Sequence, residues 1–161
     1  MHNIWPTFAE TDEHRKVRGD IQAALGSWRR FLIAVDGVDA AGKTNLARYL
    51  GWQLGMPTVE TDLFLDTGRG GLNYRIEELN AILQRRLSRD RPVIVEGVRI
   101  LRLLRQLGLT HDHLVWVEQE GHEASHSLGN DLATYDREFT PRSRANSIFT
   151  RPADDLPASA V

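Results

Sequence analysis

The chain alternates between two hydrophobic patterns, one typical of helices and one typical of buried strands. Where apolar residues recur every three or four positions, the pattern predicts amphipathic helices, and short apolar runs between them predict strands. The run over 93–95 shows no alternation, which is typical of a strand covered on both faces. The expected helices span residues 12–28, 43–54, 76–87 and 98–107. The expected strands span residues 31–35, 58–60, 93–95, 114–117 and 147–150.

The order of these elements predicts an α/β protein. Strands that alternate with helices form a parallel sheet with helices on both faces, and the chain length suits a single domain over residues 1–161. A polar segment over 118–144 interrupts the pattern and is a candidate lid, which we expect to be mobile while the site is empty. Residues 151–161 are expected to form a tail.

A glycine-rich sequence connects the first expected strand with the helix over 43–54. It has the complete form G-x-x-x-x-G-K-[ST] of a phosphate-binding loop, between the strand and the helix that this motif requires. Its residues are Gly37, Val38, Asp39, Ala40, Ala41, Gly42, Lys43 and Thr44. The two glycines allow the backbone to curl, so that its amides and the helix dipole point at a bound anion. We expect Lys43 to face solvent in the empty site and to reach the terminal phosphates of a nucleotide, while the Thr44 hydroxyl binds Mg²⁺.

The phosphate loop narrows the fold class. We expect the three-layer P-loop NTPase fold, with a central parallel sheet of about five strands. The strand over 31–35 should be central in this sheet and should neighbour the strand over 93–95. Because ligands of such sheets bind at the carboxyl ends of the strands, the catalytic side chains are expected at that edge.

Two carboxylates follow expected strands and are candidate catalytic residues. Asp62 comes after the strand over 58–60, where it could accept a proton from a substrate hydroxyl that attacks the γ-phosphate. Glu96 ends the strand over 93–95, where it could hold Mg²⁺ or bind the acceptor. The structural alternatives are a helix cap or loop residue for Asp62 and a salt-bridged strand end for Glu96.

Composition excludes several other classes of protein. The formal net charge is −2, from 20 Lys and Arg against 22 Asp and Glu, so no basic field favours a nucleic-acid partner. The chain has no cysteine, which excludes thiol chemistry and is compatible with a reducing cytosol. No apolar run has the length of a membrane span, and the first residues lack a signal-peptide core. We therefore expect a cytoplasmic protein without a membrane partner; a homodimer is one possibility.

Four parts of the chain resemble the uridine kinase and phosphoribulokinase-like family of P-loop kinases. They are residues 33–44, 61–64 and 93–97 and the pattern of residues 135–149. The resemblance implies a phosphotransferase that uses ATP and Mg²⁺ and acts on a hydroxyl of a small, nucleoside-like or sugar-like acceptor. It implies that Asp62 is the catalytic base and that Glu96 is a ligand of the metal or the substrate. It also implies a place near the acceptor for Arg69, although a solvated loop arginine is an equal alternative.

One departure from the family concerns the lid. Such kinases usually carry arginines there, often as R-L-x-R-D, which stabilise the charge of the transferred phosphoryl group. The aligned stretch of this chain is Ser127-Leu128-Gly129-Asn130-Asp131, which keeps the aspartate and lacks both arginines. Arg137, Arg142 and Arg144 follow closely and are candidate replacements. The alternative function is a P-loop nucleotide-binding module with impaired catalysis.

The lid segment also contains a sequence that fits a zinc-binding motif. His122-Glu123-Ala124-Ser125-His126 has the form H-E-x-x-H, in which His122 and His126 would bind Zn²⁺ with Glu123 as the base. The extended motif requires a third histidine, and Leu132 occupies that position. A zinc hydrolase therefore remains a remote alternative.

Overall fold

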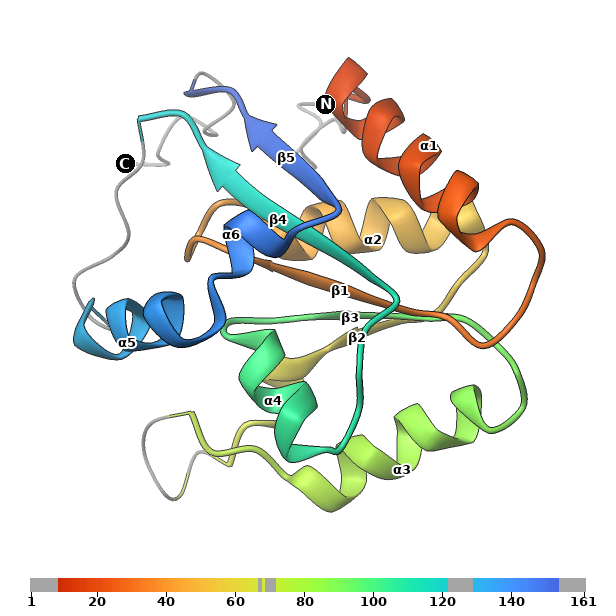
Figure 1. Ribbon diagram of the computed structural model, residues 1–161, viewed down its shortest axis with the longest axis vertical. Helices are drawn as coiled ribbons and strands as arrows, with labels where there is room; N and C mark the ends of the chain where they lie inside the picture. The colour runs from red at the N-terminus through yellow and green to blue at the C-terminus, as the bar shows by residue number, and fades with distance from the viewer. Residues whose placement is uncertain (1–8, 67, 69–71, 122–128, 154–161) are drawn as a thin grey trace, which may run out of the picture.

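A computed structural model describes residues 9–66, 68, 72–121 and 129–153 of the chain. Within these residues, five strands form one sheet in the order β2-β3-β1-β4-β5, and every neighbouring pair is parallel (Figure 1). The strands are β1 (Leu32–Gly37), β2 (Thr58–Glu60), β3 (Val93–Glu96), β4 (His113–Gln119) and β5 (Ser147–Arg151). The strand before the phosphate loop is central and pairs with β3, which confirms the prediction from the sequence.

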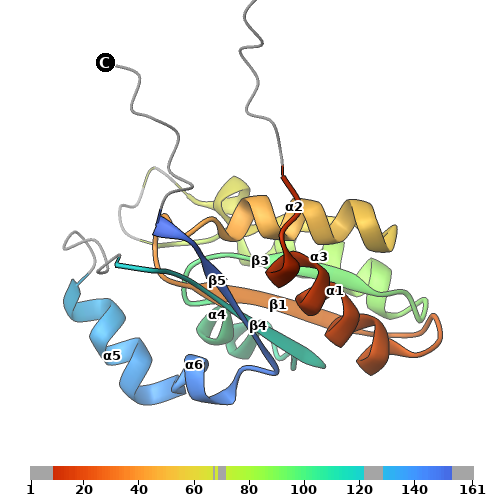
Figure 2. The same ribbon diagram turned by 90° about the horizontal axis from the view of Figure 1, so that it is seen from above.

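Helices cover both faces of this sheet. They are α1 (Asp12–Leu25), α2 (Lys43–Leu54), the 3-10 helix η1 (Thr61–Phe64), α3 (Ile76–Leu87), α4 (Ile100–Gln106), α5 (Gly129–Phe139) and α6 (Pro141–Arg144). In Figure 1, α1 and α2 lie on one side of β1 and β3, while α3 and α4 lie on the other. Figure 2 shows α5 and α6 on the same side as α4, opposite α2.

Successive residues of β1 supply two separate hydrophobic cores. Ile33 and Val35 pack with residues of α1 and α2, while Leu32 and Ala34 pack with residues of α3, α4 and α5. Side chains alternate between the faces of a strand, so a strand that is apolar at every position must be covered on both sides. These two cores confirm the expected three-layer α/β fold.

Residues 129–144 differ from the polar lid that we expected. They form α5 and α6, and α5 packs through Tyr135 and Phe139, both of which are buried in the core with α3 and α4. These two aromatic residues are four positions apart and share one helix face, but the polar residues around them conceal that face in the sequence. In this structure the described part of the segment is therefore packed on the core through α5, and its mobility stays a prediction.

The strand register brings distant parts of the sequence to one edge of the sheet. Glu96 lies beside Val35 of β1 and Glu60 of β2, so the carboxyl ends of β2 and β3 meet next to the phosphate loop. The structure extends β5 through Arg151, one residue into the expected tail, and thereby places that arginine at the same edge. In the described part of the chain, no helix is both long and apolar enough to cross a membrane.

Candidate active site

The phosphate loop joins β1 to α2 with a backbone that demands glycine at its first position. Gly37 has φ 147°, and a Cβ atom there would lie 2.0 Å from the carbonyl oxygen of Val117. Gly42 has φ 97° and precedes α2 without a side-chain cap. The first amides of α2 therefore have no capping side chain, which leaves the positive end of the helix dipole available to an anion.

Lys43 is buried, so our expectation that it faces solvent in the empty site is wrong. Its ammonium group donates hydrogen bonds to the carbonyl oxygens of Val38 at 2.8 Å and Gly37 at 3.3 Å. Burial lowers the pKa of Lys43, while the nearby carboxylates of Asp36 and Asp39 act in the opposite direction. The side chain is thus folded back onto the loop.

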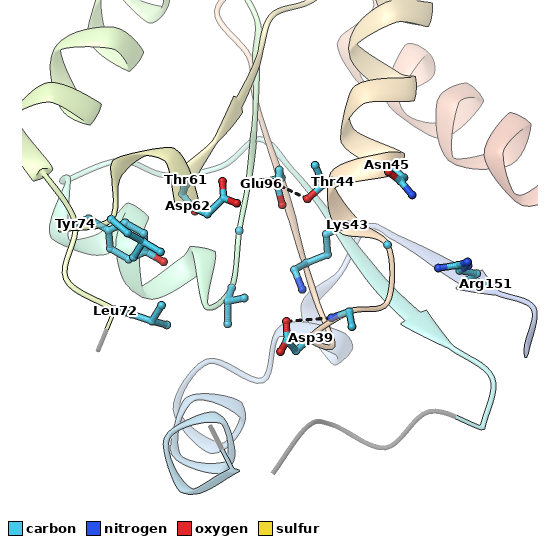
Figure 3. A pocket seen from close by; sticks show the side chains of 15 residues that line it. Asp39, Lys43, Thr44, Asn45, Thr61, Asp62, Leu72, Tyr74, Glu96 and Arg151 are labelled. Atoms are coloured by element: carbon cyan, nitrogen blue, oxygen red, sulfur yellow. Dashed lines mark hydrogen bonds between the residues drawn. The ribbon is translucent and has the colours of Figure 1, made fainter. Parts of the chain in front are cut away.

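Thr44 and Glu96 meet across the gap between α2 and β3. The Thr44 hydroxyl donates a hydrogen bond of 3.1 Å to the Glu96 carboxylate, as Figure 3 shows. Burial raises the pKa of Glu96, and the nearby charges of Asp62 and Glu60 raise it further. A cation beside Glu96 would relieve both effects, so this pair of hard oxygen ligands fits Mg²⁺.

Asp62 reaches the same site from η1. Gly97 makes this approach possible, because a Cβ atom there would lie 2.0 Å from the hydroxyl oxygen of Thr61. Asp62 is exposed, whereas Glu96 is buried. One carboxylate oxygen from each of Asp62, Glu96 and Glu60 lies within 4.8 Å of the other two. The structure therefore brings together the two carboxylates predicted from the sequence.

Glu60 is a third carboxylate at this edge, which we did not predict. It ends β2, two residues before Asp62, and this position at a strand end was the available signal. Arg48 binds both of its oxygens, at 2.6 and 2.8 Å, and this hydrogen bonding lowers the pKa of Glu60. Because Arg48 already neutralises the charge of Glu60, a metal ion would stabilise the Glu60 carboxylate less than the Glu96 carboxylate.

Several of these groups, but not Glu60, line a cavity of about 410 Å³ (Figure 3). Phosphate-loop residues and the carboxylates of Asp62 and Glu96 line one part of it. Leu65, Leu72 and Tyr74 add an apolar wall close to Asp62. Burial raises the pKa of Tyr74, whose hydroxyl is hydrogen-bonded to Thr61. A cavity that combines charged residues with an apolar wall is typical of a site for a small molecule.

The candidate lid arginines do not line this cavity. Arg142 forms two hydrogen bonds with Glu118, at 2.8 and 3.1 Å, and Arg137 bonds to the carbonyl oxygen of Ala133 in its own helix. Arg144, on α6, is exposed and is not among the cavity residues either. Two further predictions, Arg69 at the acceptor and the zinc motif of His122, Glu123 and His126, lie outside the described residues.

Helix α5 contacts the phosphate-loop strand through a buried polar pair. The Tyr135 hydroxyl donates a hydrogen bond to the carboxylate of Asp36 and accepts one from the amide of Leu101. Asp131, in the first turn of α5, binds Arg99 and Arg102 of the α4 region. These contacts join α5 both to β1, the strand that precedes the phosphate loop, and to α4.

Asp36 should make stability depend on pH in a distinctive way. Burial raises its pKa to about 6, above the value of about 3.9 expected in the unfolded chain. The folded protein therefore holds this proton more tightly, and the stabilisation is complete below pH ~4 and is lost as the pH rises through ~6. The loss should amount to about 1–3 kcal/mol of unfolding free energy. Asp36→Asn cannot ionise and should lack this decline.

Urea unfolding at low and neutral pH tests this expectation. The wild type should lose more unfolding free energy between the two conditions than Asp36→Asn does. Asp90→Asn, which replaces an exposed aspartate, serves as the control and should follow the wild type. Equal losses in the wild type and Asp36→Asn would contradict the assignment of the titration to Asp36.

Comparison with solved structures identifies other proteins of this fold. No protein-family model matches the chain. The chain is similar to a possible uridine kinase from Bacillus stearothermophilus, with a TM-score of 0.60 and 19% identity, over 86% of this chain and 97% of that one. It is also similar to the kinase domain of the tyrosine kinase ETK from Escherichia coli, with a TM-score of 0.55 and 11% identity, over 92% and 78% of the two chains.

A sequence relative of different description is a probable cell division protein WhiA from Corynebacterium diphtheriae, which is 26% identical over 152 residues. The match covers 88% of this chain and 43% of that protein, so the chain spans less than half of its length. At these identities, the solved structures establish the fold. The chain has a three-layer α/β fold, and in this fold it resembles the possible uridine kinase.

Proposed function

We propose that this protein is an ATP- and Mg²⁺-dependent kinase of a small molecule, which transfers the γ-phosphate to a nucleoside-like or sugar-like hydroxyl. The observation that carries the proposal is the shared cavity. Lys43 and Thr44 of the phosphate loop line it together with Asp62 and Glu96 from the neighbouring strand ends. A nucleotide and an acceptor could therefore meet between the loop and the carboxylates.

The phosphate loop and Glu96 would hold the nucleotide. The backbone amides of the loop bind phosphate oxygens, and Lys43 leaves the carbonyl groups of Gly37 and Val38 to contact the terminal phosphates. Thr44 and Glu96 would hold Mg²⁺, directly or through water, because their oxygens already adjoin each other. The ion would neutralise negative charge on the phosphates during transfer.

Asp62 would act on the acceptor. As the acceptor oxygen forms a bond to the γ-phosphorus, its proton passes to the Asp62 carboxylate, and the bond between the γ-phosphorus and the bridging oxygen breaks. ADP leaves with the electron pair of that bond. Asp62 is exposed and lines the cavity, so an acceptor could approach it, and the apolar wall of Leu65, Leu72 and Tyr74 offers a surface for the rest of the molecule.

A nucleotide-binding module with impaired catalysis is the second candidate. It is favoured by the absence of both lid arginines from residues 127–131 and by the ion pair that holds Arg142 on Glu118. An arginine that stabilises the transferred phosphoryl group contributes roughly a thousandfold or more in rate. The same fold could then report the presence of a nucleotide without turnover.

An acceptor screen distinguishes the two candidates. The protein is incubated with ATP and Mg²⁺ and with nucleosides, sugars or vitamin precursors, and ADP release and the mass of the product are measured. A kinase should release ADP well above its basal rate with one acceptor class and add one phosphate to that acceptor. Thermal stabilisation by ATP and Mg²⁺ without any responsive acceptor would favour the module, and absence of stabilisation would contradict both.

A further inference from the structure

Arg151 is a cation of the cavity to which neither the sequence nor the proposed mechanism gives a role. It ends β5, where its register partner is Gln119 of β4, and it lines the cavity together with Gly42, Lys43 and Asn45. A Cβ atom placed on Gly42 would lie 3.6 Å from a guanidinium nitrogen of Arg151 and 3.7 Å from its Cδ atom. The side chain therefore lies against the backbone of the phosphate loop.

The position of Arg151 indicates which part of a nucleotide it could contact. In phosphate loops the backbone amides surround the α- and β-phosphates, while the lysine reaches the β- and γ-phosphates. Figure 3 shows Asp62 and Glu96 on one side of Lys43 and Arg151 on the other, beyond Asn45. Arg151 is thus on the side of the loop away from the carboxylates that would handle the acceptor and the transferred group.

The charges of the residues that line the cavity also favour a role for Arg151 in binding. Among the described residues that line the cavity, Lys43 and Arg151 are the cations, whereas Asp39, Asp62 and Glu96 are carboxylates. A nucleoside triphosphate would add several negative charges to this surface. A guanidinium group binds phosphate with paired, charge-assisted hydrogen bonds, which a single ammonium group does not reproduce.

We propose that Arg151 binds the α- and β-phosphates of the nucleotide. This inference rests on the proposed nucleotide site and adds a specific residue to it. The contact differs in kind from the missing lid arginines, because it lies on the part of the nucleotide that leaves as ADP rather than on the transferred phosphoryl group. Arg151 is then a binding residue for substrate and product alike, and its loss should affect ATP and ADP equally.

Calorimetric titration with ADP and with ATP tests the proposal. Arg151→Ala should weaken the binding of both nucleotides by about tenfold or more, since hydrogen bonds to charged groups contribute at this level. Arg151→Lys keeps the charge but not the paired geometry and should lie between Arg151→Ala and the wild type. Arg85→Ala is the matched control, because that arginine is exposed on α3 and does not line the cavity, and it should bind both nucleotides like the wild type.

The outcomes separate this inference from the proposed function. If the wild type binds neither nucleotide, the proposed function fails and the inference fails with it. If the wild type binds both and Arg151→Ala binds them equally well, the inference is overturned while the proposed function stands. Should Arg151→Ala unfold without nucleotide, Arg151→Gln, which retains much of the side-chain length, decides: wild-type affinity in that variant also overturns the inference.

Discussion

Lys43→Ala is expected to abolish ATP binding at concentrations that saturate the wild type, with an affinity loss of at least about a hundredfold. The ammonium group lies among the loop carbonyls and near Asp36, Asp39 and Glu96. Without it, the phosphates would face these carboxylates with one fewer compensating cation. Calorimetric titration with ATP and Mg²⁺ measures the loss directly.

The burial of Lys43 makes a stability control necessary. Alanine removes the donor to the carbonyls of Gly37 and Val38 and leaves space in the loop, so the unfolding midpoint without nucleotide has to be measured as well. Lys16→Ala, on the exposed face of α1, is the matched control and should bind ATP like the wild type. A folded Lys43→Ala protein with unchanged ATP affinity would refute the assignment of the phosphate loop.

Asp62→Asn is expected to reduce turnover by roughly a hundredfold or more while hardly changing the affinity for ATP. The amide cannot accept the acceptor's proton, yet it keeps the shape of the side chain. Asp62 lies on η1, across the cavity from the loop amides, so the nucleotide would lose no contact. Steady-state rates with the acceptor found by the screen, together with ATP titration, separate the two effects.

Glu60→Gln is the matched control for Asp62→Asn. Both substitutions remove one negative charge from the same group of carboxylates, but Glu60 is held by Arg48 and is not assigned to the acceptor. If Asp62 acts as a base, Asp62→Asn should be far slower than Glu60→Gln. Equal rates in Asp62→Asn and the wild type would rule out the base.

The fold could be predicted from the sequence because its determinants are local. The apolar run of β1, the helical spacing of α2 and the intervening motif each lie within a few consecutive residues. The positions of Asp62 and Glu96 after strands were sufficient to place them at one edge, because parallel strands end together. Their joint presence in the cavity, and the contact between Thr44 and Glu96, follow from that topology.

The features that we missed depend on contacts between distant segments. The burial of Lys43 depends on how the loop folds back, and the bond between Tyr135 and Asp36 joins residues 99 positions apart. Arg151 meets Gly42 because β5 runs parallel to β4, which no local pattern around Arg151 reveals. Arg69 as an acceptor residue and the roles of the catalytic side chains stay predictions.

The ion pairs of Asp131 indicate how the segment over 127–131 could change during evolution. Arg99, at the start of α4, is buried with φ 57°, a conformation that is uncommon for a residue other than glycine, and Asp131 binds its guanidinium group. Asp131 is also the one charged position of the lid pattern that this chain retains. Its partners, Arg99 and Arg102, do not line the cavity. The contacts that attach α5 to the rest of the fold are therefore separate from the residues that would act on the phosphates. A lineage could therefore exchange the residues that face the nucleotide while the helix stayed anchored in place.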